Sequence, residues 1–346
     1  MKKLLSILLP IAMLAFAIVL VNCGDNSHPI TATNQFALIR EAPALGATGS
    51  AAQRHLPMAL RHLPVAQRRA LLRSHKLGQG TGLKPAAVEI GPGTDSVVLM
   101  NNDGSGETIV YDQGGRFWNA HMGYDGKHGV ATAEDLNGDV QVYYADLTNL
   151  NDPILTQLTT EPVDHYSAQL SWDNKTVVYM KYVEAADYDQ AAIISSSGGT
   201  ETILSTTFDI DCPTFAPSGK IVFGNDDEGI IYIMNADGTG ITQLITPGAN
   251  QYDGAPSVSP DGKTVAFERC TSEAGCDIWK ANIDGSNATR VTTNGESWDP
   301  MFINNKIVYV FYDGVDNDIY SMDPNGQNQK PLTSNSVEEY FDYWWW

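Results

Sequence analysis

Few residues of this chain have the types and spacing that catalytic or metal sites need. The sequence contains no Gly-x-Ser-x-Gly, His-Glu-x-x-His or Cys-x-x-Cys motif and no phosphate-binding glycine loop. After residue 84 there are three histidines, His121, His128 and His165, and two of them lie beside expected strands. Two histidines are too few for a zinc-type site, so we expect no metal site. Because no catalytic motif is present, we also expect no enzyme activity and no cofactor.

Two turns, 313–318 and 323–326, are rich in side chains of the calcium-ligand type. Neither has the twelve-residue spacing that ends in a bidentate glutamate. Aspartate is common in tight turns because its side chain hydrogen-bonds the local backbone. We therefore interpret these aspartates as turn residues.

Cys270 and Cys276 flank a loop between two expected strands. Pairing of these strands would bring the two sulfur atoms together, which predicts a disulfide in an oxidising compartment. Cys212 would then remain as a buried free thiol.

Short segments that combine aromatic and acidic side chains precede a series of expected strands. They are Phe117-Trp118-Asn119, His165-Tyr166-Ser167, Asp209-Ile210-Asp211, Tyr252-Asp253-Gly254, Trp298-Asp299 and Phe341-Asp342. Brought to one concave surface, such side chains would form a binding site. The alternative is that the acids cap loops and the aromatic rings pack in the core.

Internal repeats indicate the elements that position these segments. One phrase returns as Ala120–Lys127, Ala168–Lys175, Pro213–Lys220, Pro256–Lys263 and, one residue shorter, Pro300–Lys306. Its lysines are 48, 45, 43 and 43 residues apart, a period typical of propellers, solenoids and arrays. Each phrase is followed by β-branched runs and a glycine-containing turn, which predicts a four-stranded antiparallel meander.

The two ends of the chain set the number of units. Residues 86–112 are expected to supply strands two to four of a unit without a first strand, because Met100–Gly106 matches Met234–Gly240. Phe341–Trp346 would supply that first strand. The sequence therefore predicts an all-β, six-bladed β-propeller of four-stranded antiparallel blades, whose closing blade is shared between N-terminal strands and the C-terminal strand. A ring closed in this way has no exposed edge strands.

The phrase Pro256–Lys263, a following strand and the Ile-Tyr-x-Met-Asn-x-Asp-Gly hairpin that ends at Gly238 resemble the TolB-type propeller repeat. The resemblance covers roughly residues 86–346. It implies a binding or scaffold propeller, with a catalytic propeller acting on an extracytoplasmic polymer, as a polysaccharide lyase or beside a peptidase, as the alternative. Residues 36–84 are too short and too basic for the α/β domain that precedes the propeller in TolB.

In a propeller, the loops that lead into the first strands meet at one mouth of the central channel. This mouth is the predicted binding site for envelope proteins, peptides or glycan, and a cation in the acidic channel is a further option. The predicted site residues are Trp118, His121, His165, Tyr166, Asp211, Tyr252, Asp253, Trp298, Asp299 and Asp342.

The N-terminus has the layout of an export signal, with two lysines before an apolar run that ends at Val21. The segment around Cys23 resembles the lipobox of bacterial lipoproteins, although Asn22 departs from its pattern. This resemblance implies a signal peptide over 1–22, acylation of Cys23 and a place in the cell envelope, on the periplasmic side of the outer membrane. Ordinary cleavage and an uncleaved membrane span are the alternatives.

Charge is distributed unevenly along the chain. Residues 36–84 contain eight basic side chains and one acid, a balance of +7, and we expect 23–84 to be a linker with a basic, helical segment. From residue 85 to 346, the expected propeller, 11 basic and 39 acidic side chains give −28. So acidic a body repels nucleic acid, which excludes DNA and RNA as partners.

Overall fold

The computed structural model describes residues 34–40, 95–111, 115–183, 185, 188–204, 208–271 and 273–341. The chain divides into two units, Met1–Ile30 and Thr31–Trp346, and every described residue belongs to the second. The predicted signal peptide, Cys23 and most of the predicted linker therefore lie outside the described residues.

No helix among the described residues is long and apolar enough to cross a membrane.

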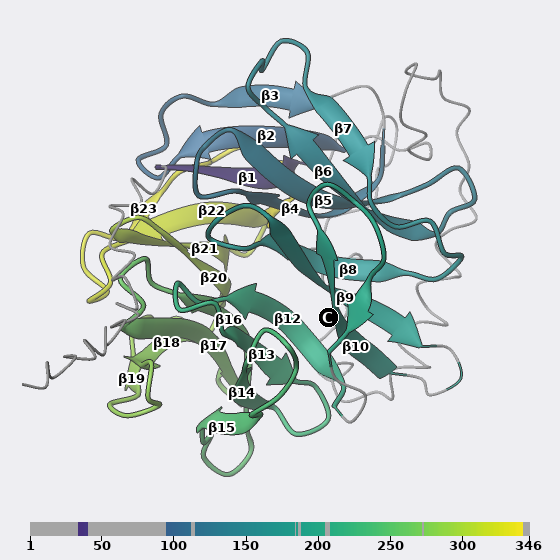
Figure 1. Cartoon of the computed structure of the whole chain (residues 1–346). Helices are drawn as coiled ribbons and strands as arrows, with labels where there is room; N and C mark the ends of the chain where they lie inside the picture. The colour runs from purple at the N-terminus through teal and green to yellow at the C-terminus, as the bar shows by residue number, and fades with distance from the viewer. Residues whose placement is uncertain are drawn as a thin grey trace, which may run out of the picture. The chain divides into compact units, whose positions relative to one another are not determined.

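The described residues form six four-stranded antiparallel sheets, arranged as the blades of a propeller (Figure 1). The first three blades are β4 (Phe117–Met122), β5 (His128–Glu134), β6 (Val140–Asp146) and β7 (Ile154–Gln157); β8 (His165–Leu170), β9 (Thr176–Val183), β10 (Tyr188–Ser195) and β11 (Thr202–Ile203); and β12 (Ile210–Phe215), β13 (Ile221–Asn225), β14 (Ile230–Met234) and β15 (Thr242–Ile245). The next two are β16 (Gln251–Val258), β17 (Thr264–Thr271), β18 (Gly275–Asn282) and β19 (Thr289–Arg290); and β20 (Ser297–Ile303), β21 (Lys306–Tyr312), β22 (Asn317–Met322) and β23 (Lys330–Pro331). The closing blade is β24 (Glu339–Tyr340), β1 (Gln35–Arg40), β2 (Ser96–Asn101) and β3 (Thr108–Tyr111).

Apolar packing between neighbouring blades closes the ring. Six buried clusters each combine side chains from two adjacent blades, and together they join all six neighbouring pairs. An inner strand such as β13 is buried along its whole length because a blade covers each of its faces. The six-bladed all-β fold predicted from the repeats is confirmed.

The closing blade differs from its predicted composition. Its second strand is β1, from the segment expected to be a linker, and all six of its residues pair with β2. The expectation that residues 86–112 supply three strands is therefore wrong. The first strand, β24, ends at Tyr340, and Asp342–Trp346 lie outside the described residues. Closure by a C-terminal strand beside N-terminal strands is confirmed.

Candidate functional site

The first strands of the blades surround a narrow central channel. Its lining residues come from or follow these strands and are Asn119, His121, Tyr124, Gln169, Cys212, Ala255, Pro256, Ser257, Asp299, Pro300, Met301 and Phe341. The open space among them is about 20 Å³, which is room for about one water molecule. A peptide or sugar does not fit into so small a space.

Different turns form the two ends of the channel. At one end, the turns between first and second strands hold the lysines of the repeated phrase, from Lys127 to Lys306, together with aspartates such as Asp125, Asp173 and Asp261. At the other end, the first strands begin and hairpins join the second and third strands; we call this end the channel mouth. Acidic side chains dominate its hairpins, and they include Asp135, Asp139, Asp226, Asp227, Glu228, Glu273, Asp313 and Asp316. The field at the mouth attracts cationic groups.

Carboxylates gather at the mouth between the β12–β15 and β16–β19 blades. Gly254 pairs with Glu268 across β16 and β17, and a Cβ atom on Gly254 would lie 3.5 Å from Glu268 Oε1 and 3.2 Å from Asp211 Oδ2. Asp211, on β12, and Glu268 therefore face each other across a residue that has no side chain. Their own side chains are buried, with 3% and 0% of their surface exposed.

The surrounding contacts connect these two acids to the half-buried part of the mouth. The backbone N–H of Ala255 donates to Asp211 Oδ2 at 3.4 Å, and the N–H of Asp299 donates to Glu268 Oε2 at 3.1 Å. The Tyr252 hydroxyl donates to Asp226. We call Asp211, Asp226, Tyr252, Glu268 and Asp299 the acidic group.

Burial and neighbouring negative charges shift the pKa values of Asp211 and Tyr252. Burial, followed by the charges of Asp226 and Glu268, raises the pKa of Asp211 well above its usual value. Burial, followed by the charges of Asp226, Asp211 and Glu268, also raises the pKa of Tyr252. A cation placed here would favour the charged carboxylates and release protons.

A recurring distortion of the first strands positions the backbone at the mouth. Ser167, Cys212, Ala255 and Asp299 hold equivalent places and have φ between 40° and 52°, and the pairing with the second strand shifts register beside each of them. Such bulges re-aim side chains. They place Cys212, Ala255 and Asp299 on the channel wall.

The predicted aromatic residues take different roles. Trp118 is only 3% exposed, and its ring packs edge-on against Tyr166 of the next blade with centroids 5.8 Å apart. Tyr166, Tyr252 and Trp298 are partly exposed, and Tyr166 donates from its hydroxyl to Asp164 at 2.9 Å. Trp118 and Tyr166 therefore contribute to the packing between blades, and Trp298 packs against the core beside the closing blade.

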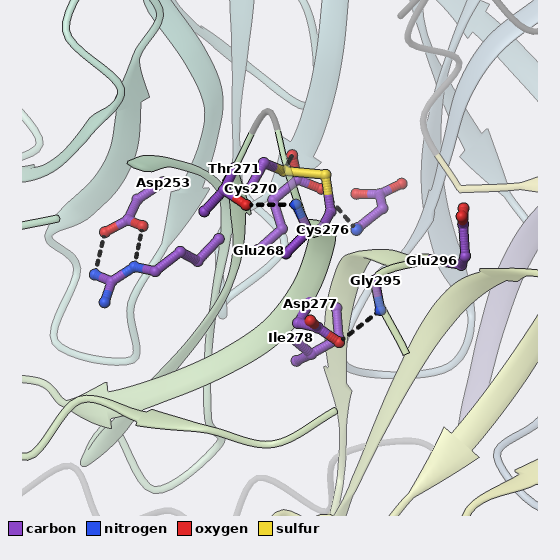
Figure 2. The surroundings of a disulfide bond; sticks show 12 residues. Asp253, Glu268, Cys270, Thr271, Cys276, Asp277, Ile278, Gly295 and Glu296 are labelled. Carbon is purple, nitrogen blue, oxygen red and sulfur yellow. Dashed lines mark hydrogen bonds and ion pairs between the residues drawn. A yellow bond between two sulfur atoms is a disulfide. The ribbon is translucent and has the colours of Figure 1, made fainter. Parts of the chain in front are cut away.

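Asp253 has a structural partner within the blade. It pairs across the strands with Arg269, whose Nε and Nη2 atoms lie 2.5 and 2.6 Å from the two carboxylate oxygens (Figure 2). Both side chains are buried. Its negative charge is matched inside the fold by Arg269.

The two predicted histidines are buried and apart from any metal-type cluster of the described residues. His121 lines the channel, and burial lowers its pKa to about 4. Burial also lowers the pKa of His165, whose Nδ1 lies 3.1 Å from the Val140 carbonyl oxygen. Among the described residues, the group of three metal-type ligands is Asp313, Asp316 and Asp318.

The cysteine pairing predicted from the sequence is present. Cys270 and Cys276 form a disulfide at the end of the β17–β18 hairpin (Figure 2). Cys212 takes no part in this disulfide, and its buried thiol lies on the channel wall. Asp342, a predicted site residue, lies outside the described residues.

Sequence reasoning missed Glu268 and Asp226. Glu268 is an acid inside a strand whose neighbours are buried, and that anomaly is the signal that could have identified it. Asp226 begins an Asp-Asp-Glu-Gly hairpin, which was visible but does not precede a first strand.

The sequence matches no family model, and a search of curated proteins finds no match. Solved structures share the fold. TolB from Acinetobacter baumannii has a TM-score of 0.62 at 17% identity, over 72% of this chain and 62% of that one. A protein described as TolB from Agrobacterium tumefaciens has a TM-score of 0.59 at 21% identity, over 70% of this chain and 89% of that one.

An oligogalacturonate lyase from Vibrio parahaemolyticus has a TM-score of 0.50 at 13% identity, over 70% of this chain and 72% of that one. These likenesses establish the fold, a six-bladed β-propeller like those of the TolB structures. The chain spans less than two thirds of the length of the A. baumannii protein.

Proposed function

We propose that this protein is a binding or scaffold protein of the bacterial cell envelope, and that its channel mouth binds a positively charged segment of a protein or peptide partner. The observation that carries the proposal is the acidic group, in which Asp211 and Glu268 are buried against each other. A lysine or arginine of the partner would relieve this repulsion.

The partly exposed members of the group define where the partner makes contact. Asp226, Asp299 and Tyr252 are half-buried, and Trp298 lies beside Asp299. Tyrosine and tryptophan are enriched among the few residues that contribute most of the binding energy of protein interfaces. A cationic group of the partner would favour the charged forms of the fully buried Asp211 and Glu268. Their charges would then act on the partner, because a low-dielectric surrounding screens them less than water does.

The location rests on the N-terminal sequence and on the fold. Acylation of Cys23 would hold the propeller at the periplasmic side of the outer membrane. The balance of −28 from residue 85 onward would keep the propeller away from anionic headgroups and favour basic partners. The likeness to TolB proteins supports an envelope role, and partnership with envelope proteins is part of the proposal.

A capture experiment with matched charge variants tests this function. Asp226→Asn with Asp299→Asn removes two charges from the mouth, and asparagine tolerates the positive φ of residue 299. Asp152→Asn with Asp237→Asn removes two charges from exposed turns at the opposite end. From detergent-solubilised membranes, the native protein and the second variant should capture the same partner, and the mouth variant should lose it. Equal capture by both variants would contradict the proposal.

The alternative is a catalytic propeller that acts on an extracytoplasmic polymer. The same fold occurs in an oligogalacturonate lyase, so oligogalacturonate is the substrate to test. Formation of unsaturated products by the native protein would favour this alternative.

A further inference from the structure

Three aspartates converge in the hairpin that joins β21 and β22 at the channel mouth. Asp313, Asp316 and Asp318 each place a carboxylate oxygen within 4.8 Å of the others. Two oxygens on opposite sides of a calcium ion, at about 2.3–2.6 Å each, are about 4.6–5.2 Å apart. One ion of that size can therefore contact all three carboxylates.

One oxygen of the Asp316 carboxylate is buried and makes no hydrogen bond to the described residues. The Asp316 side chain is 4% exposed, and this oxygen is its Oδ2 atom. A buried carboxylate oxygen in this condition is costly unless a donor or a cation approaches it. The missing partner of this oxygen points to a ligand independently of the convergence of the three carboxylates.

The neighbouring blade shows what normally balances the charge at this position. Asp277, which holds the place of Asp318 at the start of an Asp-Ile-aromatic strand, accepts from the Arg290 guanidinium and from Thr292 Oγ1 at 2.8 Å. Arg290 pairs with Trp279, and Pro331 pairs with Tyr320 in the next blade. Arg290 and Pro331 therefore hold equivalent positions in the two blades.

In the β20–β23 blade, the threonine is retained, because Thr333 Oγ1 donates to Asp318 Oδ1 at 3.2 Å. The guanidinium is replaced by proline, while Asp313 and Asp316 add two further carboxylates. Compared with the β16–β19 blade, the β20–β23 blade therefore lacks the positive charge at this position and has more negative charge around it.

Further acids surround the three. Burial and the charges of Asp313 and Glu339 raise the pKa of Asp316, and burial and the charge of Asp316 raise that of Asp318 to about 6. Glu339 is fully buried, accepts from Arg40 at 2.6 Å, and has a second oxygen, Oε2, without a hydrogen-bond partner among the described residues.

We propose that Asp313, Asp316 and Asp318 bind a calcium ion. The donors are all oxygen atoms, which suits a hard cation. We propose calcium over magnesium because calcium accepts flexible geometry with oxygens at about 2.3–2.6 Å, whereas magnesium needs strict octahedral geometry at about 2.0–2.1 Å.

The site also has a structural consequence for ring closure. The Asn317 backbone N–H donates to Glu338 Oε2 at 3.2 Å, so the hairpin contacts the segment that enters β24. Calcium would stabilise the hairpin against which the C-terminal strand closes the ring, and its binding would stabilise the folded protein by mass action.

Calcium titration of the full-length protein tests the site. Isothermal titration and melting curves with calcium, with magnesium and with a chelator should show calcium binding and a melting temperature that rises with calcium. Asp316→Asn and, as a variant at an exposed ligand, Asp313→Asn should each lower the calcium affinity about ten-fold or more. Both variants should fold without calcium, because each loses like-charge repulsion and asparagine preserves the local hydrogen bonds.

Asp227→Asn is the matched control, since it removes one exposed charge from the corresponding β13–β14 hairpin. It should keep the native calcium response. No calcium binding by the native protein would overturn the proposal, as would an unchanged affinity in Asp313→Asn and Asp316→Asn. Loss of calcium binding without loss of partner capture would leave the function proposed for the mouth unaffected.

Discussion

Asp211 and Glu268 belong to neighbouring blades and meet across Gly254, whose missing side chain leaves both carboxylates within 3.5 Å of the place where a Cβ atom would lie. A second glycine, Gly224, pairs with Asp211 inside its own blade, and its Cβ position is 3.0 Å from Asp211 Oδ2. Two glycines therefore make room for a buried acid. The fold stores like-charge repulsion at its channel mouth.

Removing one of these charges should stabilise the fold. Asp211→Asn keeps the oxygen that accepts from Ala255 and removes the buried charge, so we expect the melting temperature at pH 8 to rise by a few degrees, roughly 1–2 kcal/mol in the free energy of unfolding. Thermal melts at pH 8 and pH 5 provide the measurement. A lower melting temperature at pH 8 would show that the carboxylate is stabilised by the fold.

The buried ion pair of Asp253 and Arg269 should respond in the opposite way. Arg269→Met leaves the Asp253 carboxylate buried without its two hydrogen bonds, and we expect a loss of about 3–5 kcal/mol in chemical denaturation. Adding Asp253→Asn should recover part of that loss, because the isolated charge is gone. A double variant as unstable as the sum of the two single variants would indicate that the pair is not coupled.

Asp209 should make stability depend on pH. Burial and the charge of Asp189 raise its pKa to about 7, above the value of the unfolded chain. Its contribution is thus complete below about pH 4 and is lost as pH rises through about 7.

We expect Asp209→Asn to be more stable than the native protein at pH 8 by roughly 2–4 kcal/mol and to be similar to it at pH 4. Asparagine can still accept from the Asp189 N–H, which lies 2.7 Å from Asp209 Oδ1. Denaturation at both pH values tests this. A constant difference between the two proteins across that range would contradict the raised pKa.

The lipid anchor is tested at Cys23. Cys23→Ala should block acylation, leave the precursor unprocessed at this position and remove the lipid mass from the protein. Mass spectrometry of the membrane fraction measures both effects. Unchanged processing and membrane association would rule out lipidation.

The spacing of the internal repeats predicted most of the fold, because each of the five complete blades contains the repeated phrase that begins at Ala120 in the first of them. β1 was missed because residues 41–95 separate it from β2, the strand with which it pairs. In addition, no first strand with the repeated phrase precedes β1 in the sequence. The site was predicted only in part. Asp253 was assigned to the mouth because its pairing with Arg269 depends on strand register, which local sequence does not reveal.

Glu268 escaped notice for a related reason. It lies in a second strand, and its place at the mouth depends on Gly254 across the ladder and on Asp211 from the next blade. The bulges at Ser167, Cys212 and Asp299 likewise have no glycine beside them to mark them.

The most direct test of the account is the binding of a labelled oligolysine peptide to the full-length protein, followed by fluorescence anisotropy at low and high salt. The native protein and the variant with Asp152→Asn and Asp237→Asn should bind with equal affinity, which should fall as salt rises. The variant with Asp226→Asn and Asp299→Asn should bind about ten-fold more weakly at low salt while melting no lower than the native protein. Equal affinity of the two double variants would contradict the assignment of the channel mouth as the binding site.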